Sequence, residues 1–476
     1  MLKEGYAVWQ CGSHEISLTR PRIMGILNVT PDSFSDGGEH LDVDAAVEHA
    51  LEMLDQGADI IDVGGESTRP GHTPVSPNEE AERVVPVIRK ILAAVPDAII
   101  SIDTRHPEVA KMCARLGASI INDVTGFTNP AMVEVAAGTS CGCVITHWDR
   151  TLEERPTRRQ VSLDDAKPVR VVPSSQRFTL PEEAPIMRNV MGFLGDSART
   201  LLRAGIAKER ICVDPGAGFD KDTNQDVVIQ RATRSMVSMG YPLMCAVSRK
   251  RFTGAVSGEK DVAQRDAASI GIALSSIASG ARILRVHNVA ETAQAVNSYW
   301  AVSHKDPRQA FVSIGSNMGD RLDNLSRAVA LIDHIPLTAV VQVSHAYDTA
   351  PAYGISSSVA NAVVEVRTEL HPLVLLDELL KVEETLGRVR PEGQDGFGDR
   401  VIDCDLEWVE GERHSGRKLT LPHARMGERD YVILPMEDLM HDPARFFLYA
   451  NAPVKVLPRE ERVGMVISDL GELTWE

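Results

Sequence analysis

Residues 98–124 read AIISIDTRHPEVAKMCARLGASIINDV, and this stretch holds the unit from which the first part of the chain is built. Its two ends, Ala98–Asp103 and Ser119–Val124, are apolar almost without a break, as strands of a parallel sheet covered on both faces are. The segment that opens at His106-Pro107 reads as a helix. The stretch therefore predicts two parallel strands joined by a helix.

Six more apolar runs of this kind occur in the first three hundred residues, which makes eight. They are Ile23–Val29, Asp59–Gly65, Cys141–Trp148, Arg210–Gly216, Pro242–Ser248 and Arg282–Asn288. The intervals read as helices, because Asp42–Gln56 has apolar residues at helical spacing and Ser76-Pro77-Asn78-Glu79 has the spacing of a capping box. Eight strand–helix units predict an α/β fold, the (β/α)8 TIM barrel.

Polar residues recur where these strands end. They are Asn28, Asp62, Asp103, Asn122, His147, Asp214, Ser248-Arg249-Lys250, Arg285 and His287. Any single one is more often a turn or capping residue, but the whole set predicts an active site, because a barrel builds its site at this face. The loops Asn28–Gly38 and Gly64–Gly71 are rich in glycine, proline and hydroxyl groups, and we expect them to act as mobile lids.

A second, smaller domain is expected after the barrel. We place the boundary in the short polar stretch Ser303–Arg308, which gives domains at residues 1–303 and 309–476. The elements expected there follow the β-α-β-β-α-β order of a ferredoxin-like α+β domain. They are Ala310–Ser316, Leu322–His334, Val340–Thr349, Ala360–Thr368, Leu373–Leu386 and Val401–Trp408.

The last of these strands belongs to the sequence RVIDCDLEW, residues 400–408, in which Asp403 and Asp405 point to the same face. A solvated face of an edge strand explains this pair of carboxylates. A divalent cation held between them explains it equally well, and the segment alone leaves both interpretations open.

The composition argues against several classes of function. The net charge of −17 argues against a nucleic-acid partner, and it means that an anionic substrate has to be met by local cations or a metal. The chain has no apolar run of membrane length and no signal pattern at its start, so we expect no membrane association and a cytoplasmic location. Seven scattered cysteines predict reduced thiols, and Cys141 and Cys143 are expected to be buried strand residues.

Seven motifs of the first domain resemble those of dihydropteroate synthase. They are NVTPDSFSDGG (28–38), GGESTRPG (64–71), SIDT (101–104), IND (121–123), DPGAGFDK (214–221), SRK (248–250) and RVHN (285–288). The resemblance implies that this domain joins a dihydropterin carrying a CH2-pyrophosphate to p-aminobenzoate, so that pyrophosphate leaves and dihydropteroate forms. It also implies a homodimer formed through the barrel.

The same resemblance implies roles for individual residues of the barrel. Those for pterin binding are Asp103, Asn122, Asp214 and Lys250. Those for p-aminobenzoate binding are Thr68, Arg69 and Ser248, with Lys250 beside them. The cations expected to act in catalysis are Arg69, Lys250, Arg285 and His287, because positive charge stabilises pyrophosphate as its bond to carbon breaks. Asn28 matches a position that contacts Mg²⁺.

Residues 310–445 resemble 6-hydroxymethyl-7,8-dihydropterin pyrophosphokinase, which transfers pyrophosphate from ATP to the pterin hydroxymethyl group. The motifs are GSNMG (315–319), GRVR (387–390), RVIDCDLEW (400–408), LPHARM (421–426) and RDYVILP (429–435). The resemblance implies that Asp403 and Asp405 bind Mg²⁺ and act in catalysis with Arg388 and Arg400. It implies ATP binding by Glu383, Arg388, Arg390, Arg400, His423 and Arg429. It implies pterin binding by Asn361 and Tyr431.

Both domains depart from these family patterns in places. In the barrel, Ala246, Thr146 and Asn288 replace the usual Gly, Met and Asp, and residues 150–188 form a long polar insertion. In the second domain, Val359 stands at the place of a stacking aromatic, while Asp399 and Val401 replace Pro and Thr.

These patterns favour a bifunctional enzyme of folate biosynthesis that takes dihydropterins, p-aminobenzoate and ATP as substrates. One alternative is an active barrel whose second domain has become a scaffold or a regulatory domain. A pterin-binding methyltransferase barrel would keep Asp103, Asn122 and Asp214, but it has no use for the two lid loops with Arg69, whose presence argues against it.

Overall fold

The computed structural model describes residues 8–30, 39–66, 74–148, 184–353, 355, 357–389 and 398–475. The chain divides into two compact units, Met1–Val296 and Asn297–Glu476. Within the described stretches, no helix has both the length and the apolar character needed to cross a membrane. All seven cysteines are buried and none forms a disulfide, which confirms the expectation for Cys141 and Cys143.

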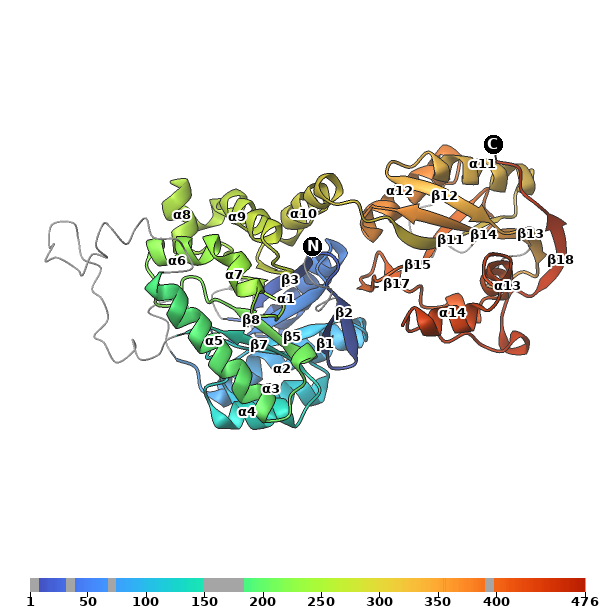
Figure 1. The fold of residues 1–476 in the computed structure, drawn as a ribbon. Coiled ribbons are helices and arrows are strands. Elements are labelled where there is room, and N and C mark those ends of the chain that lie inside the picture. The colour runs from blue at the N-terminus through green and yellow to red at the C-terminus, as the bar shows by residue number, and fades with distance from the viewer. Residues whose placement is uncertain are drawn as a thin grey trace, which may run out of the picture. The chain divides into compact units, whose positions relative to one another are not determined.

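The first unit contains the predicted barrel, built from eight parallel strands (Figure 1). They are β3 (Arg22–Asn28), β4 (Ile60–Gly64), β5 (Ile100–Asp103), β6 (Ile120–Asp123), β7 (Gly142–Thr146), β8 (Ile211–Asp214), β9 (Met244–Cys245) and β10 (Ile283–Val286). The strand order is β8-β7-β6-β5-β4-β3-β10-β9. A parallel bridge between Val213 and Leu243 joins the two ends of this order, so the sheet closes.

Helices follow the strands and lie outside them (Figure 1). They are α1 (Glu39–Asp55), α2 (Pro77–Ala94), α3 (Pro107–Leu116), α4 (Pro130–Ala137), α5 (Pro185–Arg203), α6 (Thr223–Arg231), α7 (Thr233–Val237), α8 (Arg251–Ser257), α9 (Asp266–Ala278) and α10 (Val289–Ser303). The predicted start of α2 is correct, because the Ser76 hydroxyl accepts the Glu79 N–H and Pro77 takes the first helical position.

Side chains that point into the barrel change from apolar to polar along the strands. The apolar floor contains Ile60, Ile120, Cys212 and Ile283, packed against the hairpin β1 (Val8–Cys11) and β2 (His14–Ser17). Two residues further along each strand, on the same face, stand Asp62, Asn122, Asp214 and Arg285. The polar set is therefore held above a packed floor. The sequence did not reveal the hairpin, because its two strands are only four residues each.

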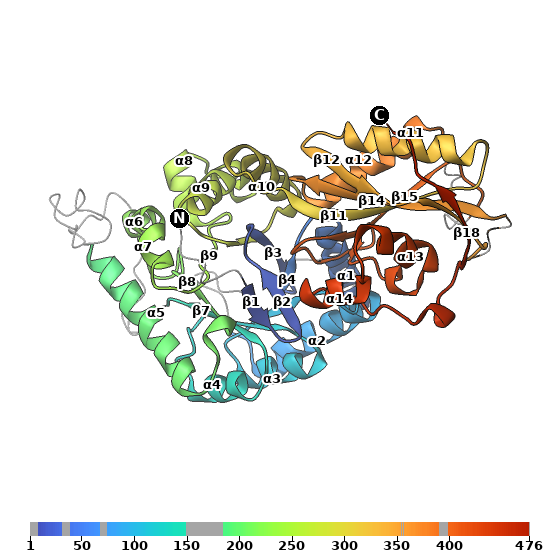
Figure 2. The same ribbon diagram turned by 45° about the vertical axis from the view of Figure 1, so that its right-hand side comes forward.

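The second unit is an antiparallel sheet in the order β15-β11-β14-β13-β18, with β12 also paired to β14. Its elements are β11 (Arg308–Ser316), α11 (Arg321–Asp333), β12 (Thr338–Val343), β13 (Ala346–Thr349), β14 (Val359–Thr368), α12 (Pro372–Thr385), β15 (Asp403–Val409), β16 (His414–Ser415), β17 (Thr420–Leu421), α13 (Asp430–Leu439), α14 (Pro443–Tyr449) and β18 (Val466–Gly471). Figure 2 shows α11 and α12 on one face of the sheet and α13 and α14 on the other. The predicted β-α-β-β-α-β order is present except that its second strand is divided into β12 and β13.

One predicted strand of this unit was wrong in its extent. The run Val340–Thr349 forms two strands, β12 and β13, separated by Ser344 and His345. The hydroxyl of Ser344 accepts the N–H of Val363 at 2.9 Å. A side chain thus replaces a backbone acceptor there, and the ladder is interrupted.

Candidate active sites

The first candidate site is centred on Arg285 inside the barrel. Its Nε donates to Asp62 Oδ2 at 2.6 Å, and its Nη2 donates to Asp103 Oδ2 at 2.5 Å. Asn122 Nδ2 donates to Asp62 Oδ2 at 3.2 Å, while Asn122 Oδ1 is buried and accepts no hydrogen bond from any described residue. Two acids from the neighbouring strands β4 and β5 are therefore gathered around one cation, and the Asn122 amide beside them keeps an unused acceptor.

Burial sets the charge state of this site. Desolvation raises the pKa of Asp103 to about 7, against the pull of Arg285. Desolvation also raises the pKa of Asp214, whose Oδ1 accepts the Gly216 N–H at 2.8 Å. It lowers the pKa of Lys250, and the nearby charge of Arg285 adds to this effect while Asp214 and Asp103 oppose it. Lys250, Asp214, Asp103 and Arg285 thus form one electrostatic group.

Further predicted residues lie along the same rim. Ser248 Oγ is 2.9 Å from His287 Nδ1, and Asn28 ends β3. Lys250 Nζ lies 4.4 Å from the centre of the Phe219 ring, which is also close to Trp148. Thr68 and Arg69 lie outside the described residues.

Two members of this site were not assigned by the sequence. Asp62 was noted as a strand-end residue but given no role, although it is the second partner of Arg285. Phe219 stands inside the quoted DPGAGFDK motif, which is the signal that could have found it. Its aromatic face makes the rim beside Lys250 partly apolar.

The second candidate site lies on β15, at one edge of the described sheet. Asp403 is bound by Arg388 and, at 3.1 Å, by Arg400. Asp405 Oδ2 accepts from Arg429 Nη1 at 3.1 Å. Arg388 also bonds Glu383 Oε1 at 2.6 Å, and the Cys404 N–H donates to the same oxygen at 2.8 Å. The predicted arginines and acids therefore meet, and buried Glu383 ties α12 to this strand.

The predicted pterin residue Asn361 shares a row with Asp403. In the sheet, Gly315 of β11 pairs with Asn361 on one side and with Asp403 on the other. A Cβ added at Gly315 would lie 2.6 Å from Asn361 Oδ1, so glycine leaves this space open. Tyr431 lies nearby in the chain, with its ring centre 5.5 Å from Arg429 Cζ. Arg390 lies outside the described residues.

Glu407 was missed by the sequence analysis although it follows Asp405 by two residues on the same face. It is fully buried, accepts from Ser313 Oγ at 2.8 Å and lies 3.6 Å from Arg429 Nη1. Burial raises its pKa to about 8. Burial, with the charge of Arg429, lowers the pKa of His423 to about 3, so His423 is neutral at neutral pH. The three arginines Arg388, Arg400 and Arg429 therefore supply the positive charge among the described residues of this site.

The acidic pair fits a divalent cation by its chemistry. Burial and the like charge of Asp403 raise the pKa of Asp405, and a bound cation would relieve this repulsion. Among the described residues, no group of three or more His, Cys, Asp or Glu side chains is arranged to hold a metal ion. Two carboxylates suffice for Mg²⁺ when phosphates and water complete its ligands.

Two departures from the family patterns have a local explanation. Asp399 Oδ1 accepts from Asn317 Nδ2 at 2.7 Å, and Asn317 Oδ1 accepts from the Arg400 N–H at 2.7 Å. Asp399 thus joins the loop before β15 to the GSNMG motif. In the barrel, Asn288 Nδ2 donates to Asp266 Oδ2 at 3.0 Å.

Comparisons with known proteins agree with this geometry. The family model described as pterin binding enzyme matches residues 24–287, and that of 7,8-dihydro-6-hydroxymethylpterin-pyrophosphokinase matches residues 311–441. Dihydropteroate synthase of Neisseria meningitidis serogroup C is 38% identical over 300 residues, which cover 62% of this chain and 97% of that protein. The dihydropteroate synthase of Escherichia coli (strain K12) is 36% identical over 284 residues, 59% of this chain and 91% of that one.

A solved structure shows the same likeness in the fold. The dihydropteroate synthase of Xanthomonas albilineans in complex with 7,8-dihydropteroate has 33% sequence identity and a TM-score of 0.52. The match covers 63% of this chain and 100% of that chain.

The barrel and its polar slot therefore define a pterin-binding enzyme. The chain belongs to the dihydropteroate synthase family, and a hydroxymethyl-dihydropterin pyrophosphokinase domain follows its barrel. It is a bifunctional enzyme of folate biosynthesis, in which one domain pyrophosphorylates the dihydropterin and the other forms dihydropteroate.

Proposed function

We propose that the slot around Arg285 is the pterin site of the barrel. The observation that supports this most is the buried, unpaired Oδ1 of Asn122 beside Asp103. A dihydropterin edge offers N–H donors next to acceptors, and a buried acceptor without a partner is costly until such a donor arrives. Asp214 and Lys250 complete the slot, because both belong to the electrostatic group of Arg285 and Asp103.

Cationic side chains and one aromatic ring account for the other steps of the proposed reaction in the barrel. The amine nitrogen of p-aminobenzoate attacks the pterin CH2 carbon, the C–O bond breaks, and pyrophosphate leaves while the amine loses a proton. His287 and Arg285, with Arg69 from the lid loop, stabilise the charge that grows on pyrophosphate. Ser248, Lys250 and Thr68 bind p-aminobenzoate, and Phe219 supports Lys250. Asn28 contacts Mg²⁺ in this proposal.

In the second domain, Asp403 and Asp405 would hold Mg²⁺ together with ATP. The metal would supply charge neutralisation between phosphates, which phosphoryl-type transfer needs more than covalent help. Arg388, Arg400 and Arg429, with Arg390, bind the phosphates of ATP in this proposal. Glu383 and His423 also belong to the proposed ATP site. Glu383 bonds Arg388 at 2.6 Å, and neutral His423 lies 3.6 Å from Glu407. Asn361 and Tyr431 bind the pterin, since Asn361 lies in the same row as Asp403.

The two sites act in sequence, because the product of the second domain is the substrate of the barrel. The domain limits 1–303 and 309–476, a homodimer through the barrel and a cytoplasmic location belong to this proposal. A second domain that serves as a scaffold or regulator need not bind ATP and would release no AMP, and this provides the contrast for a test.

Reciprocal variants of the full chain test these assignments. Lys250→Met should stop dihydropteroate formation from supplied pterin pyrophosphate and leave AMP release from ATP and hydroxymethyl-dihydropterin intact. Asp405→Asn should do the reverse. If Asp405→Asn keeps normal AMP release and normal ATP binding with Mg²⁺, the proposed kinase site is wrong. If Lys250→Met keeps its dihydropteroate activity, the proposed barrel site is wrong.

A further inference from the structure

The turn that carries Ser248 and Lys250 has an unusual backbone. Arg249, between them, has a φ of 56°, in the left-handed region that non-glycine residues rarely adopt. Such a conformation persists only where the surroundings hold it, and it is found preferentially at functional sites. In this turn it directs Ser248 toward His287 and Lys250 toward Phe219.

Residues at the start of α9 hold Arg249 in this conformation. Its Nε donates to Asp266 Oδ1 and its Nη2 to Asp266 Oδ2, both at 2.7 Å. Its backbone N–H donates to Ser269 Oγ at 2.9 Å, one turn further along the helix. Both carboxylate oxygens of Asp266 are thus used, and the guanidinium has a fixed plane.

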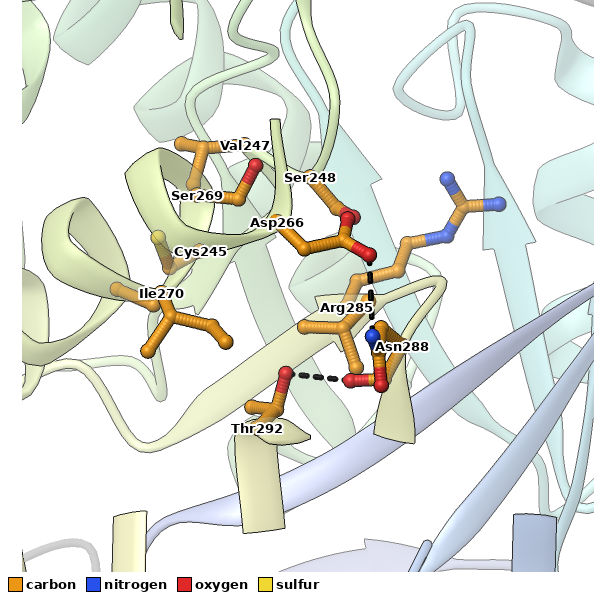
Figure 3. A pocket seen from close by; sticks show the side chains of 11 residues that line it. Cys245, Val247, Ser248, Asp266, Ser269, Ile270, Arg285, Asn288 and Thr292 are labelled. Atoms are coloured by element: carbon orange, nitrogen blue, oxygen red, sulfur yellow. Dashed lines mark hydrogen bonds between the residues drawn. The ribbon is translucent and has the colours of Figure 1, made fainter. Parts of the chain in front are cut away.

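Asn288 also bonds Asp266 (Figure 3). Its Nδ2 donates to Asp266 Oδ2 at 3.0 Å, and its Oδ1 accepts the Glu291 N–H at the start of α10. Figure 3 also shows Asp266 and Asn288 beside Ser248 and Arg285, around one small pocket. We call the hydrogen bonds of Arg249 and Asn288 to Asp266 the clamp. An amide can donate to Asp266 where a second carboxylate would repel it, which accounts for asparagine at this position.

We infer that Asp266 and Asn288 are positioning residues for dihydropteroate formation. Asp266 bonds Arg249, the middle residue of the turn, and Asn288, which directly follows His287 in the chain. Asp266 and Asn288 also line one small pocket with Ser248 and Arg285. By holding the left-handed turn, they set where Ser248 and Lys250 stand. A displacement of about 1 Å of such groups lowers a rate by up to about 100-fold. This inference rests on the proposed roles of Ser248 and Lys250.

Asp266→Asn tests the clamp, with Asp59→Asn as its matched control. Asp59 is also paired with an arginine, Arg22, at 3.1 Å, and its side chain is 15% exposed against 13% for Asp266. It lies before β4, at the opposite end of the barrel, outside the proposed machinery. We expect Asp266→Asn to lower kcat/KM for p-aminobenzoate by about tenfold or more, and Asp59→Asn to leave it within about twofold.

Urea unfolding reports whether the barrel of each variant is folded, and we expect the barrel of both variants to unfold as that of the wild type does. AMP release belongs to the second domain, so its being unchanged shows only that this domain is intact. If Asp266→Asn matches Asp59→Asn in kcat/KM, the inference fails. Loss of activity in Lys250→Met remains the separate test of the proposed site, and it does not depend on Asp266.

Substitution of Arg249 by glycine distinguishes a positioning role of the clamp from an effect on stability alone. Arg249→Ala removes the clamp and keeps the backbone strain, whereas Arg249→Gly removes the clamp and also the strain. We expect the kcat/KM of Arg249→Gly to be at least about fivefold higher than that of Arg249→Ala. When Asp266→Asn is combined with Arg249→Gly, we expect little further loss of kcat/KM. Equal activities of the two position-249 variants, or fully additive effects, would overturn the inference even if Asp266→Asn alone folds poorly.

Discussion

The two sites of this chain neutralise charge in opposite ways. In the barrel, a single arginine, Arg285, serves two carboxylates, Asp62 and Asp103. On β15, three arginines serve two aspartates, Asp403 and Asp405. The barrel side chains project from strands of a closed sheet, whereas the arginines of the second site come from three segments around an edge strand.

This difference corresponds to what each site has to bind. A slot for a neutral ring with N–H donors needs fixed acceptors in excess, and the closed barrel supplies them above its apolar floor. A site for a metal and a triphosphate needs cations and anions that can change partners. The arginines around β15 can change partners, because Asp403 has two of them. The following predictions test this contrast.

The largest effect is expected for Arg285→Met. It leaves Asp62 and Asp103 facing each other in the barrel interior without a cation, which costs about 3–5 kcal/mol of folding free energy. Urea unfolding should measure this loss, and dihydropteroate formation should disappear. A variant that is as stable as the wild type would show that the two carboxylates do not depend on Arg285.

Removal of divalent cations should act strongly on the second site. A chelator should lower AMP release by about 100-fold or more, because the phosphate charges are then met by arginines alone. Mg²⁺ should restore the rate, and Asp403→Asn should need a higher Mg²⁺ concentration for half of its maximal rate. If AMP release continues unchanged without divalent ions, the proposal that Asp403 and Asp405 bind a catalytic metal is wrong.

The pKa of Asp103 predicts opposite pH dependences for pterin binding and stability. Its folded value is about 7, above the ordinary unfolded value of about 3.9. Its protonation therefore stabilises the fold fully below about pH 4, and this contribution is lost as the pH rises to about 7. Pterin binding, which uses the ionised acceptor, should weaken by up to about tenfold per pH unit below about 7.

Calorimetric titration of the pterin measures this dependence at about pH 6 and about pH 8. Asp103→Asn binds more weakly, but its affinity should not change with pH across this range. A flat profile for the wild type would mean that Asp103 stays ionised throughout, held by Arg285.

The smallest effect is expected for Arg400→Met. Asp403 keeps Arg388 as a partner, so the loss of folding free energy should stay below about 1 kcal/mol. The KM for ATP should nevertheless rise, since Arg400 is proposed to bind phosphate. A loss of stability as large as that of Arg285→Met would break the contrast between the two sites.

The sequence predicts the fold well because its signals are local. Each barrel strand is an apolar run with a polar end, and each can be recognised without the others. The hairpin Val8–Ser17 is too short to give such a signal. The break at Ser344 depends on a hydroxyl that reaches a backbone N–H of another strand, which no local pattern predicts.

The sequence located the polar strand ends and the pair Asp403 and Asp405 by pattern alone, but it gave roles only to residues that match family motifs. Asp62 lies in the middle of β4, and its role depends on Arg285, 223 positions away in the chain. Glu407 became a candidate only when Ser313 and Arg429 were found against it. Asn288 bonds Asp266, which lies at the start of α9. The sequence therefore shows that asparagine replaces the usual aspartate at position 288, but it does not show why.

One assay tests the central claim that two sites of one chain act in succession. Purified full-length protein receives hydroxymethyl-dihydropterin, ATP, Mg²⁺ and p-aminobenzoate, and AMP and dihydropteroate are quantified separately. The account predicts that both form, that Asp405→Asn removes both, and that supplied pterin pyrophosphate restores dihydropteroate in this variant. Absence of AMP with the wild-type chain, while supplied pterin pyrophosphate still yields dihydropteroate, would contradict it and leave the second domain as a scaffold.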